Sequence, residues 1–141
     1  MKNVKNFDFS HLGHYSEYGS LIPLEENSSI PFDIKRVYYI YDVPNGIRRG
    51  FHSHYDLEQM LICVSGSVKI LTKTPYESEI TLLDSPQKGL YIGPMIWREM
   101  YDFTDDAVLL VLASQPYTVE DYIRDYDKYE KSAVAYFGKE S

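Results

Sequence analysis

Short apolar segments, separated by turn residues, run through most of the chain. They are rich in β-branched and aromatic residues, which favour strands. The turn signals between them include Asn45-Gly46, Ser65-Gly66 and Gly93-Pro94. We predict strands over residues 20–24, 34–41, 50–54, 58–64, 67–72, 80–83, 89–92, 99–103 and 108–113.

No helical segment separates these strands, which argues against a parallel α/β sheet. An antiparallel sandwich, a jelly roll and another type of barrel are left, and we favour the jelly roll. Beyond Ala113 the pattern changes, because Thr118 can cap a turn into the charged, tyrosine-rich residues 119–131. We therefore predict one all-β domain over residues 1–141, a jelly-roll barrel with short helical segments at its C-terminus.

Composition and charge narrow the function classes. Hydrophobic residues make up 44% of the chain and aromatic residues 15%, as in a folded globular protein. The formal net charge of -7 argues against a nucleic-acid partner, because a phosphate backbone is bound by an excess of Lys and Arg. A small anionic ligand needs only a few local cations and stays possible.

Cysteine content and hydropathy predict the cellular setting. Cys63 is the only cysteine and lies in an apolar run, so we expect it to fill the core. Residues 1–10 lack the apolar stretch of a signal peptide, and no apolar run reaches bilayer length. We expect a cytoplasmic protein that does not associate with a membrane.

The segment with the most chemistry is Phe51-His52-Ser53-His54. Side chains alternate across a strand, so His52 and His54 are predicted to point to one face, with backbone sites roughly 6.6 Å apart. Two such imidazoles can bind a metal, transfer protons or form a polar patch. A pair in a strand, followed by Glu58, favours a functional role.

The pattern His52-x-His54-x3-Glu58-x7-Gly66 resembles the first motif of the cupins, and residues 89–97 occupy the place of the second. In metal-dependent cupins the second motif contributes a further histidine ligand. Arg98 stands about where that ligand would be, and a guanidinium cannot donate a lone pair to a cation. We therefore expect a cupin-type barrel without a metal or another cofactor.

A closer resemblance, to the bacterial sugar 3,4-ketoisomerases, covers nearly the whole chain. The matching runs are Gly19-Ser20-Leu21, Glu25-Glu26-Asn27, Ile30-Pro31-Phe32, Ile34-Lys35-Arg36-Val37-Tyr38-Tyr39-Ile40, Arg49-Gly50-Phe51-His52, Leu57-Glu58-Gln59, Gly93-Pro94, Trp97, Glu99-Met100 and Asp121-Tyr122-Ile123-Arg124. The resemblance implies a metal-free jelly-roll homodimer that acts on dTDP-4-keto-6-deoxyglucose. It also implies a 3-keto product that is later aminated for surface polysaccharides.

By analogy with that family, His52 is the principal base at carbon and His54 is its partner, serving the oxygens. The sequence alone does not distinguish the two roles. Tyr38 and Arg98 are candidate donors to the enediolate, whose developing charge needs preorganised stabilisation. Alternation sends one of Tyr38 and Tyr39 inward, and we expect it to be Tyr38.

Four further residues are candidate substrate contacts. Arg49 precedes the histidines and is the expected diphosphate ligand, whereas Arg48 should face the other way. Glu58 is expected to orient a histidine or contact sugar hydroxyls, and Trp97 either walls the sugar pocket or belongs to the core. The galacto-forming branch of the family tends to carry Arg and His at the positions of Tyr18 and Arg98, so we predict a gluco product.

Three other functions fit the same residues. A dTDP-sugar 3,5-epimerase is another metal-free cupin that abstracts protons beside the same ketone. A metal-dependent cupin oxygenase would use His52, His54 and Glu58 as ligands. A non-catalytic sugar-binding barrel is the third, because a fold alone does not establish activity.

Overall fold

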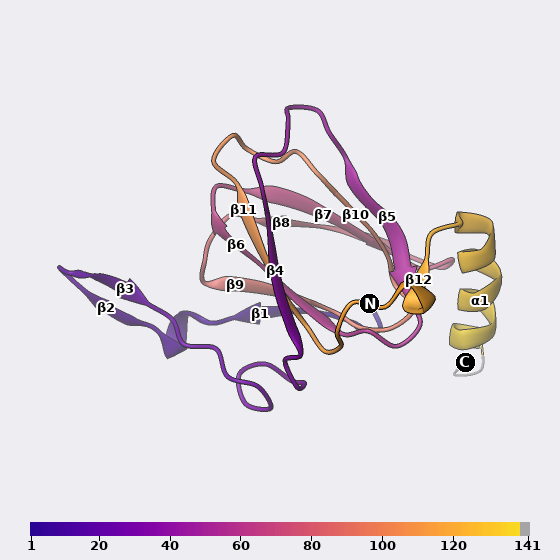
Figure 1. Cartoon of the computed structure of the whole chain (residues 1–141), viewed down its shortest axis with the longest axis horizontal. Coiled ribbons are helices and arrows are strands. Elements are labelled where there is room, and N and C mark those ends of the chain that lie inside the picture. Colours follow the sequence, from indigo (N-terminus) through magenta and orange to yellow (C-terminus); the bar gives the residue numbers. More distant parts are fainter. Residues whose placement is uncertain (139–141) are drawn as a thin grey trace.

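Two five-stranded antiparallel sheets form the body of the protein in a computed structural model, which describes residues 1–138. The strand order is β1-β9-β6-β11-β4 in the first sheet and β12-β5-β10-β7-β8 in the second. A separate hairpin, β2-β3, projects from the barrel (Figure 1). The predicted all-β architecture is confirmed.

The strands are β1 (Val4–Asp8), β2 (His14–Ser16), β3 (Gly19–Leu21), β4 (Arg36–Tyr41), β5 (Arg49–His54), β6 (Gln59–Ser65), β7 (Val68–Lys73), β8 (Ser78–Leu83), β9 (Lys88–Ile92), β10 (Trp97–Tyr101), β11 (Val108–Ala113) and β12 (Tyr122–Ile123). The helices are the 3-10 turns η1 (Ser10–Leu12) and η2 (Val119–Asp121) and the α-helix α1 (Tyr126–Gly138).

The main core lies between the two sheets. Alternate residues of β7, such as Val68 and Ile70, are fully buried there, together with Leu61 and Leu109 from the first sheet. Cys63 belongs to this cluster, as predicted. Each strand buries one apolar face in this core, and this burial is the main hydrophobic contribution to the packing of the two sheets.

The outer face of the first sheet is also covered. Phe9, Ile30 and Phe32 from the N-terminal part of the chain pack against Met60 and Ile62 of β6. This second layer explains why the first five residues of β6, 59–63, are all buried. It also explains the continuous apolar run around Cys63, since both faces of that strand meet apolar side chains.

The C-terminal segment closes one end of the barrel (Figure 1). In place of several short helices over residues 119–131, the chain forms η2, the short strand β12 beside β5, and one 13-residue helix. Tyr129 and Ala133, four residues apart on α1, are fully buried against Met95 and Trp97. This shared packing face favours a single helix that continues to Gly138.

The N-terminal segment departs most from the prediction. The strand expected over residues 20–24 ends at Leu21, and β1 and β2 were not predicted. β1 is a polar edge strand, Val4–Asp8, that pairs with β9 and buries little side-chain surface, so it lacks the apolar alternation that marks a strand.

Among the described residues, no helix combines the length and apolar composition needed to cross a membrane.

Gly50 sets the position of the two histidines. Its φ is +94°, and a β-bulge lies between Arg98 and Glu99 on the neighbouring strand. A Cβ atom at Gly50 would lie 2.8 Å from the carbonyl oxygen of Arg98. Glycine is therefore required for both its conformation and its close approach to β10.

We expect Gly50→Ala to destabilise the protein more than Gly46→Ala does. Gly46 has φ +81° with nothing near its Cβ position, so its substitution carries only the conformational cost, about 1–2 kcal/mol. Gly50→Ala adds the clash with β10. Urea denaturation of both variants measures the difference, and equal losses would contradict the proposed constraint.

Candidate active site

His52 and His54 point to the same side of β5, as the alternation predicted. Their ring centroids are 4.9 Å apart in an edge-to-face arrangement. His52 lines a cavity, whereas His54 is only 1% exposed and lies deeper, with the ring of Tyr122 4.3 Å away. The two imidazoles therefore form a pair in which His52 is the accessible member.

Hydrogen bonds at Nδ1 define the tautomer of both rings. The Nδ1 atom of His52 lies 3.1 Å from the carbonyl oxygen of Gly50, and that of His54 lies 3.2 Å from Oδ2 of Asp121. A carbonyl or an ionised carboxylate can only accept, so we infer that each Nδ1 carries the hydrogen. The lone pair of each neutral ring is then at Nε2, where a base needs it.

Arg98 lies beside the histidines and is fully buried. It pairs with His52 across the β10–β5 ladder. Its Nε and Nη2 atoms both donate to the carbonyl oxygen of Ile96 at 3.1 Å, and Nη1 donates to Gln59 at 2.6 Å. Burial lowers the pKa of Arg98 to about 10, so its charge persists at neutral pH.

Gln59 connects Arg98 to Tyr38. Its Oε1 accepts from the guanidinium, and its Nε2 donates to the Tyr38 hydroxyl oxygen at 3.1 Å. Tyr38 faces the barrel interior while Tyr39 is 63% exposed, which confirms the predicted orientation. Burial raises the pKa of Tyr38, so its neutral hydroxyl keeps a hydrogen to donate.

The cavity opens between the edge strand β4 of one sheet and β5 and β12 of the other, with a volume of about 440 Å³. Three arginines line it, namely Arg36, Arg49 and Arg124. The Arg36 guanidinium lies 5.0 Å from the ring of Tyr38, and that of Arg124 lies 4.3 Å from Tyr122. Besides these arginines and the two tyrosines, the cavity is lined by Tyr39, Ile40, Gly50, His52, Met100 and Tyr117. The arrangement suits a polar ligand with negative charge.

Burial and positive charge keep both imidazoles neutral. Burial, assisted by Arg98, lowers the pKa of His52 from 6.5 to about 3. The same two causes lower the pKa of His54 further. A neutral ring has at Nε2 the free lone pair that a general base needs.

Two predicted substrate contacts lie away from the cavity. Glu58 accepts a 2.6 Å hydrogen bond from the hydroxyl of Tyr91, and the carboxylate on His54 is that of Asp121. The prediction that Glu58 orients a histidine is therefore corrected. Trp97 is 4% exposed and packs between β10 and α1, so it belongs to the core and not to the cavity wall.

Of the two other predicted substrate contacts, Arg49 lines the cavity of its own chain and Tyr18 does not. Arg49 lines the cavity, and Arg48 turns away to pair with Glu99 at 2.7 Å, as expected from their alternation. Tyr18 is 92% exposed at the turn of the β2-β3 hairpin, which extends away from its own barrel (Figure 1).

Several site residues received no individual role from the sequence, namely Arg36, Gln59, Tyr117, Asp121, Tyr122 and Arg124. Asp121 lies 67 positions from His54 in the chain, so no local spacing connects them. Arg36, Gln59 and residues 121–124 lie in runs that matched the ketoisomerase resemblance, and this was the one available signal for them.

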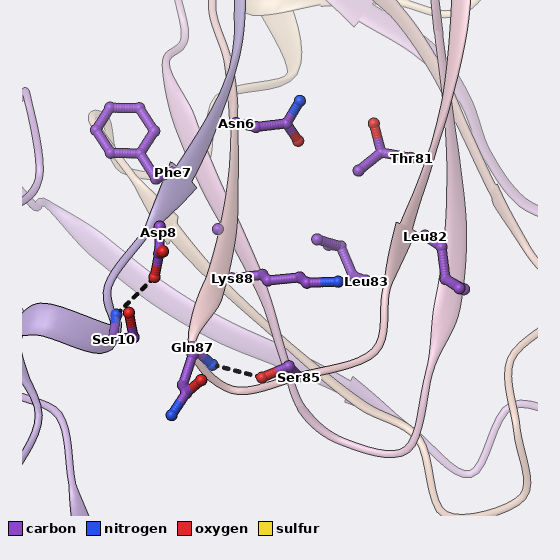
Figure 2. A pocket seen from close by; sticks show the side chains of 11 residues that line it. Asn6, Phe7, Asp8, Ser10, Thr81, Leu82, Leu83, Ser85, Gln87 and Lys88 are labelled. Carbon is purple, nitrogen blue, oxygen red and sulfur yellow. Dashed lines mark hydrogen bonds between the residues drawn. The ribbon is translucent and has the colours of Figure 1, made fainter.

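A second cavity lies at the other seam between the sheets, where β1 and β9 approach β8 (Figure 2). Figure 2 shows short internal hydrogen bonds at its edge, from the Ser10 amide to Asp8 and from the Gln87 amide to Ser85. Its lining includes Lys88, which is paired with Asp84. None of its eleven lining residues is a histidine, so the paired bases belong to the first cavity.

Metal binding was one of the alternatives that the sequence left open. Within residues 1–138, no group of three or more His, Cys, Asp or Glu side chains is placed to hold a metal ion. Glu58, the third ligand expected for a metal cupin, is engaged with Tyr91.

An antiparallel barrel that carries two neighbouring imidazoles and a buried arginine is a cupin-type fold. The chain belongs to the family whose model is described as FdtA, WxcM-like, C-terminal, which matches residues 2–134. This is the family of the sugar 3,4-ketoisomerases, and the protein is accordingly an isomerase.

Individual relatives agree over most of the chain. The TDP-4-oxo-6-deoxy-alpha-D-glucose-3,4-oxoisomerase of Aneurinibacillus thermoaerophilus is 50% identical over 80% of this chain and 81% of its own. A histidine-to-asparagine variant of the 3,4-ketoisomerase QdtA from Thermoanaerobacterium thermosaccharolyticum, solved with TDP-4-keto-6-deoxyglucose, is 52% identical, with a TM-score of 0.94 over 97% and 98% of the two chains. WlaRB, the TDP-quinovose 3,4-ketoisomerase of Campylobacter jejuni, is 45% identical with a TM-score of 0.88 over 93% and 99%.

We expect stability to fall as the pH drops from 8 to 5, in part because of His52. Its pKa is 6.5 in the unfolded chain and about 3 in the fold, so below pH 6.5 protons bind preferentially to the unfolded chain. The loss from this group by pH 5 is up to about 2 kcal/mol. Urea denaturation at both pH values should show a smaller fall for His52→Asn, and an unchanged difference would contradict the pKa shift.

Proposed function

We propose that the protein converts dTDP-4-keto-6-deoxyglucose to dTDP-3-keto-6-deoxyglucose by histidine acid–base catalysis. The observation that carries the proposal is the neutral His52 ring at the cavity, with Nδ1 engaged by the Gly50 carbonyl and Nε2 available. The substrate named for the QdtA complex and for the Aneurinibacillus enzyme supports this choice of sugar.

The reaction transfers two hydrogens and requires no oxidant. His52 Nε2 removes the proton from C3, and that electron pair forms the C3–C4 double bond while O4 receives a proton. The resulting enediol loses the proton on O3 as the C3 carbonyl forms, and C4 takes a proton back from His52. His54 is the candidate relay between the two oxygens, because its ring lies beside His52.

Two groups stabilise the enediolate. Tyr38 accepts from Gln59, which leaves its own O–H free to donate to a substrate oxygen at the cavity. Arg98 is fully buried, does not line the cavity and donates to Ile96 and Gln59, so the direct donation to the enediolate expected from the sequence is corrected. It acts through its charge, which is poorly screened because the side chain is buried. The same charge disfavours a divalent cation beside the histidines, which supports a site that works without a metal.

The three arginines at the cavity supply the diphosphate contacts. Arg49 is the residue expected from the sequence, and Arg36 and Arg124 line the same opening. Guanidinium groups bind phosphate oxygens through paired N–H donors. The nucleotide therefore lies at the rim, with the sugar directed toward His52.

The gluco product rests on Tyr18 and Arg98, since the resemblance places Arg and His there in the galacto-forming branch. The similarity to a TDP-quinovose ketoisomerase agrees with this assignment. We assign the product to an aminotransferase step in surface polysaccharide formation. The cytoplasmic location stays a prediction.

Purified protein incubated with dTDP-4-keto-6-deoxyglucose should form the 3-keto isomer. Proton NMR of the reaction mixture detects this product. We expect His52→Asn to lose at least about 10²-fold in turnover, since general base catalysis contributes that much, and to retain dTDP binding. Inversion at C3 and C5 without carbonyl movement would identify an epimerase. Stoichiometric iron in the purified protein, with activity lost to chelators, would identify an oxygenase. Binding of the sugar nucleotide without any chemical change would indicate a non-catalytic barrel.

We further propose a homodimer in which the β2-β3 hairpin of one protomer reaches the partner's cavity. A two-stranded hairpin is marginally stable alone, and this one exposes Tyr15, Tyr18 and Leu21. The unpaired edge strand β4, beside the cavity, exposes Val37 and Tyr39. Packing the hairpin of one protomer against the partner's β4 would remove both apolar surfaces from water and so stabilise the dimer.

Sedimentation should give twice the 16.4 kDa chain mass. If Tyr18 serves the partner's site, mixing inactive His52→Asn with impaired Tyr18→Ala should restore activity, because each mixed dimer then contains one complete site. A monomer, or a mixture no more active than its parts, would contradict the arrangement.

A further inference from the structure

Asp121 is a buried carboxylate held in a fixed orientation at the end of η2. Its Oδ1 accepts the Asp56 amide at 2.9 Å, and its Oδ2 accepts the Leu57 amide at 3.3 Å. The side chain is 8% exposed. Burial raises the pKa of Asp121, and these two amide donors act against that rise by favouring the ionised form.

Oδ2 of the same carboxylate faces His54. It lies 3.2 Å from Nδ1, and the opposite ring nitrogen, Nε2, is buried and makes no hydrogen bond with any residue between 1 and 138. An unsatisfied buried nitrogen is costly, which is a reason to expect a ligand or relay partner there when the site is occupied. The Met95 amide donates to the His54 carbonyl at 2.8 Å and fixes the backbone at this point.

Charge gives Asp121 a second effect on the ring. Arg98 is fully buried nearby, and its cation opposes a second positive charge on His54. The carboxylate of Asp121 interacts favourably with the Arg98 cation and offsets part of its field. A proton passing through His54 would otherwise meet an uncompensated cation in a medium that screens poorly.

We propose that Asp121 is a positioning residue that holds His54 in the Nδ1–H tautomer and stabilises its transient protonation. His54 then presents the Nε2 lone pair to the reacting oxygens. The inference rests on the proposed ketoisomerase function, because it assigns a role through His54 and makes no substrate contact itself.

Asp121→Asn distinguishes this role from a structural one. An amide has one acceptor oxygen, so it cannot satisfy Asp56 and still accept from both Leu57 and His54. If its oxygen stays on Asp56, its NH₂ group faces His54 and favours hydrogen at Nε2. Asp56→Asn is the matched control, because it removes a neighbouring exposed negative charge and leaves the Asp121–His54 contact in place.

The readouts are steady-state kinetics and two-bond ¹⁵N–¹H spectra of histidine-labelled protein, with His54 assigned from its loss in His54→Asn. We expect wild type and Asp56→Asn to carry hydrogen at Nδ1. Asp121→Asn should move it to Nε2 and lower kcat between about 10²- and 10⁴-fold, with little change in KM.

Hydrogen at Nε2 of His54 in the wild-type protein would overturn the inference, and this test holds even if Asp121→Asn does not fold. Retained kcat in a folded Asp121→Asn would overturn it, as would lost kcat with an unchanged tautomer. Absence of turnover by wild type would overturn the proposed function instead, and the tautomer spectra would then decide the Asp121 contact alone.

Discussion

The burial of the Arg98 guanidinium between the two sheets is the constraint on which the site depends. A charge removed from water has to be held by local hydrogen bonds, and Arg98 uses the Ile96 carbonyl and Gln59 for this purpose. Burial, together with the field of Arg98, keeps His52 and His54 neutral, and the same field disfavours a cation beside them. Gln59 in turn fixes the hydroxyl of Tyr38, so one buried charge organises the donor and both bases.

Backbone geometry places the bases around that charge. Gly50 allows β5 to pass close to β10 at the bulge, and its carbonyl then sets the tautomer of His52. The C-terminal segment does the same for His54, since η2 brings Asp121 to the ring and β12 pairs with the histidine strand. The helix α1 anchors this segment by burying Tyr129 beneath Trp97, which explains why a tryptophan next to Arg98 serves the core.

Local sequence patterns predicted the parts of the site that depend on alternation. β11 begins and ends where its apolar run predicted, and the inward direction of Tyr38 and the shared face of the histidines follow from the two-residue period of a strand. Asp121 and Gln59 could not be assigned roles in this way, because their partners lie 67 and 39 positions away. The polar edge strand β1 was missed for the opposite reason, since its own residues carry no apolar period.

Proton transfer between adjacent carbons is the central claim, and turnover in D₂O tests it most directly. A base that exchanges its proton with solvent before returning it should place deuterium at C4 of the 3-keto product, while C5 keeps its original hydrogen. His52→Asn should abolish that incorporation. Deuterium at C5, or incorporation at C4 that survives the loss of His52, would contradict the account.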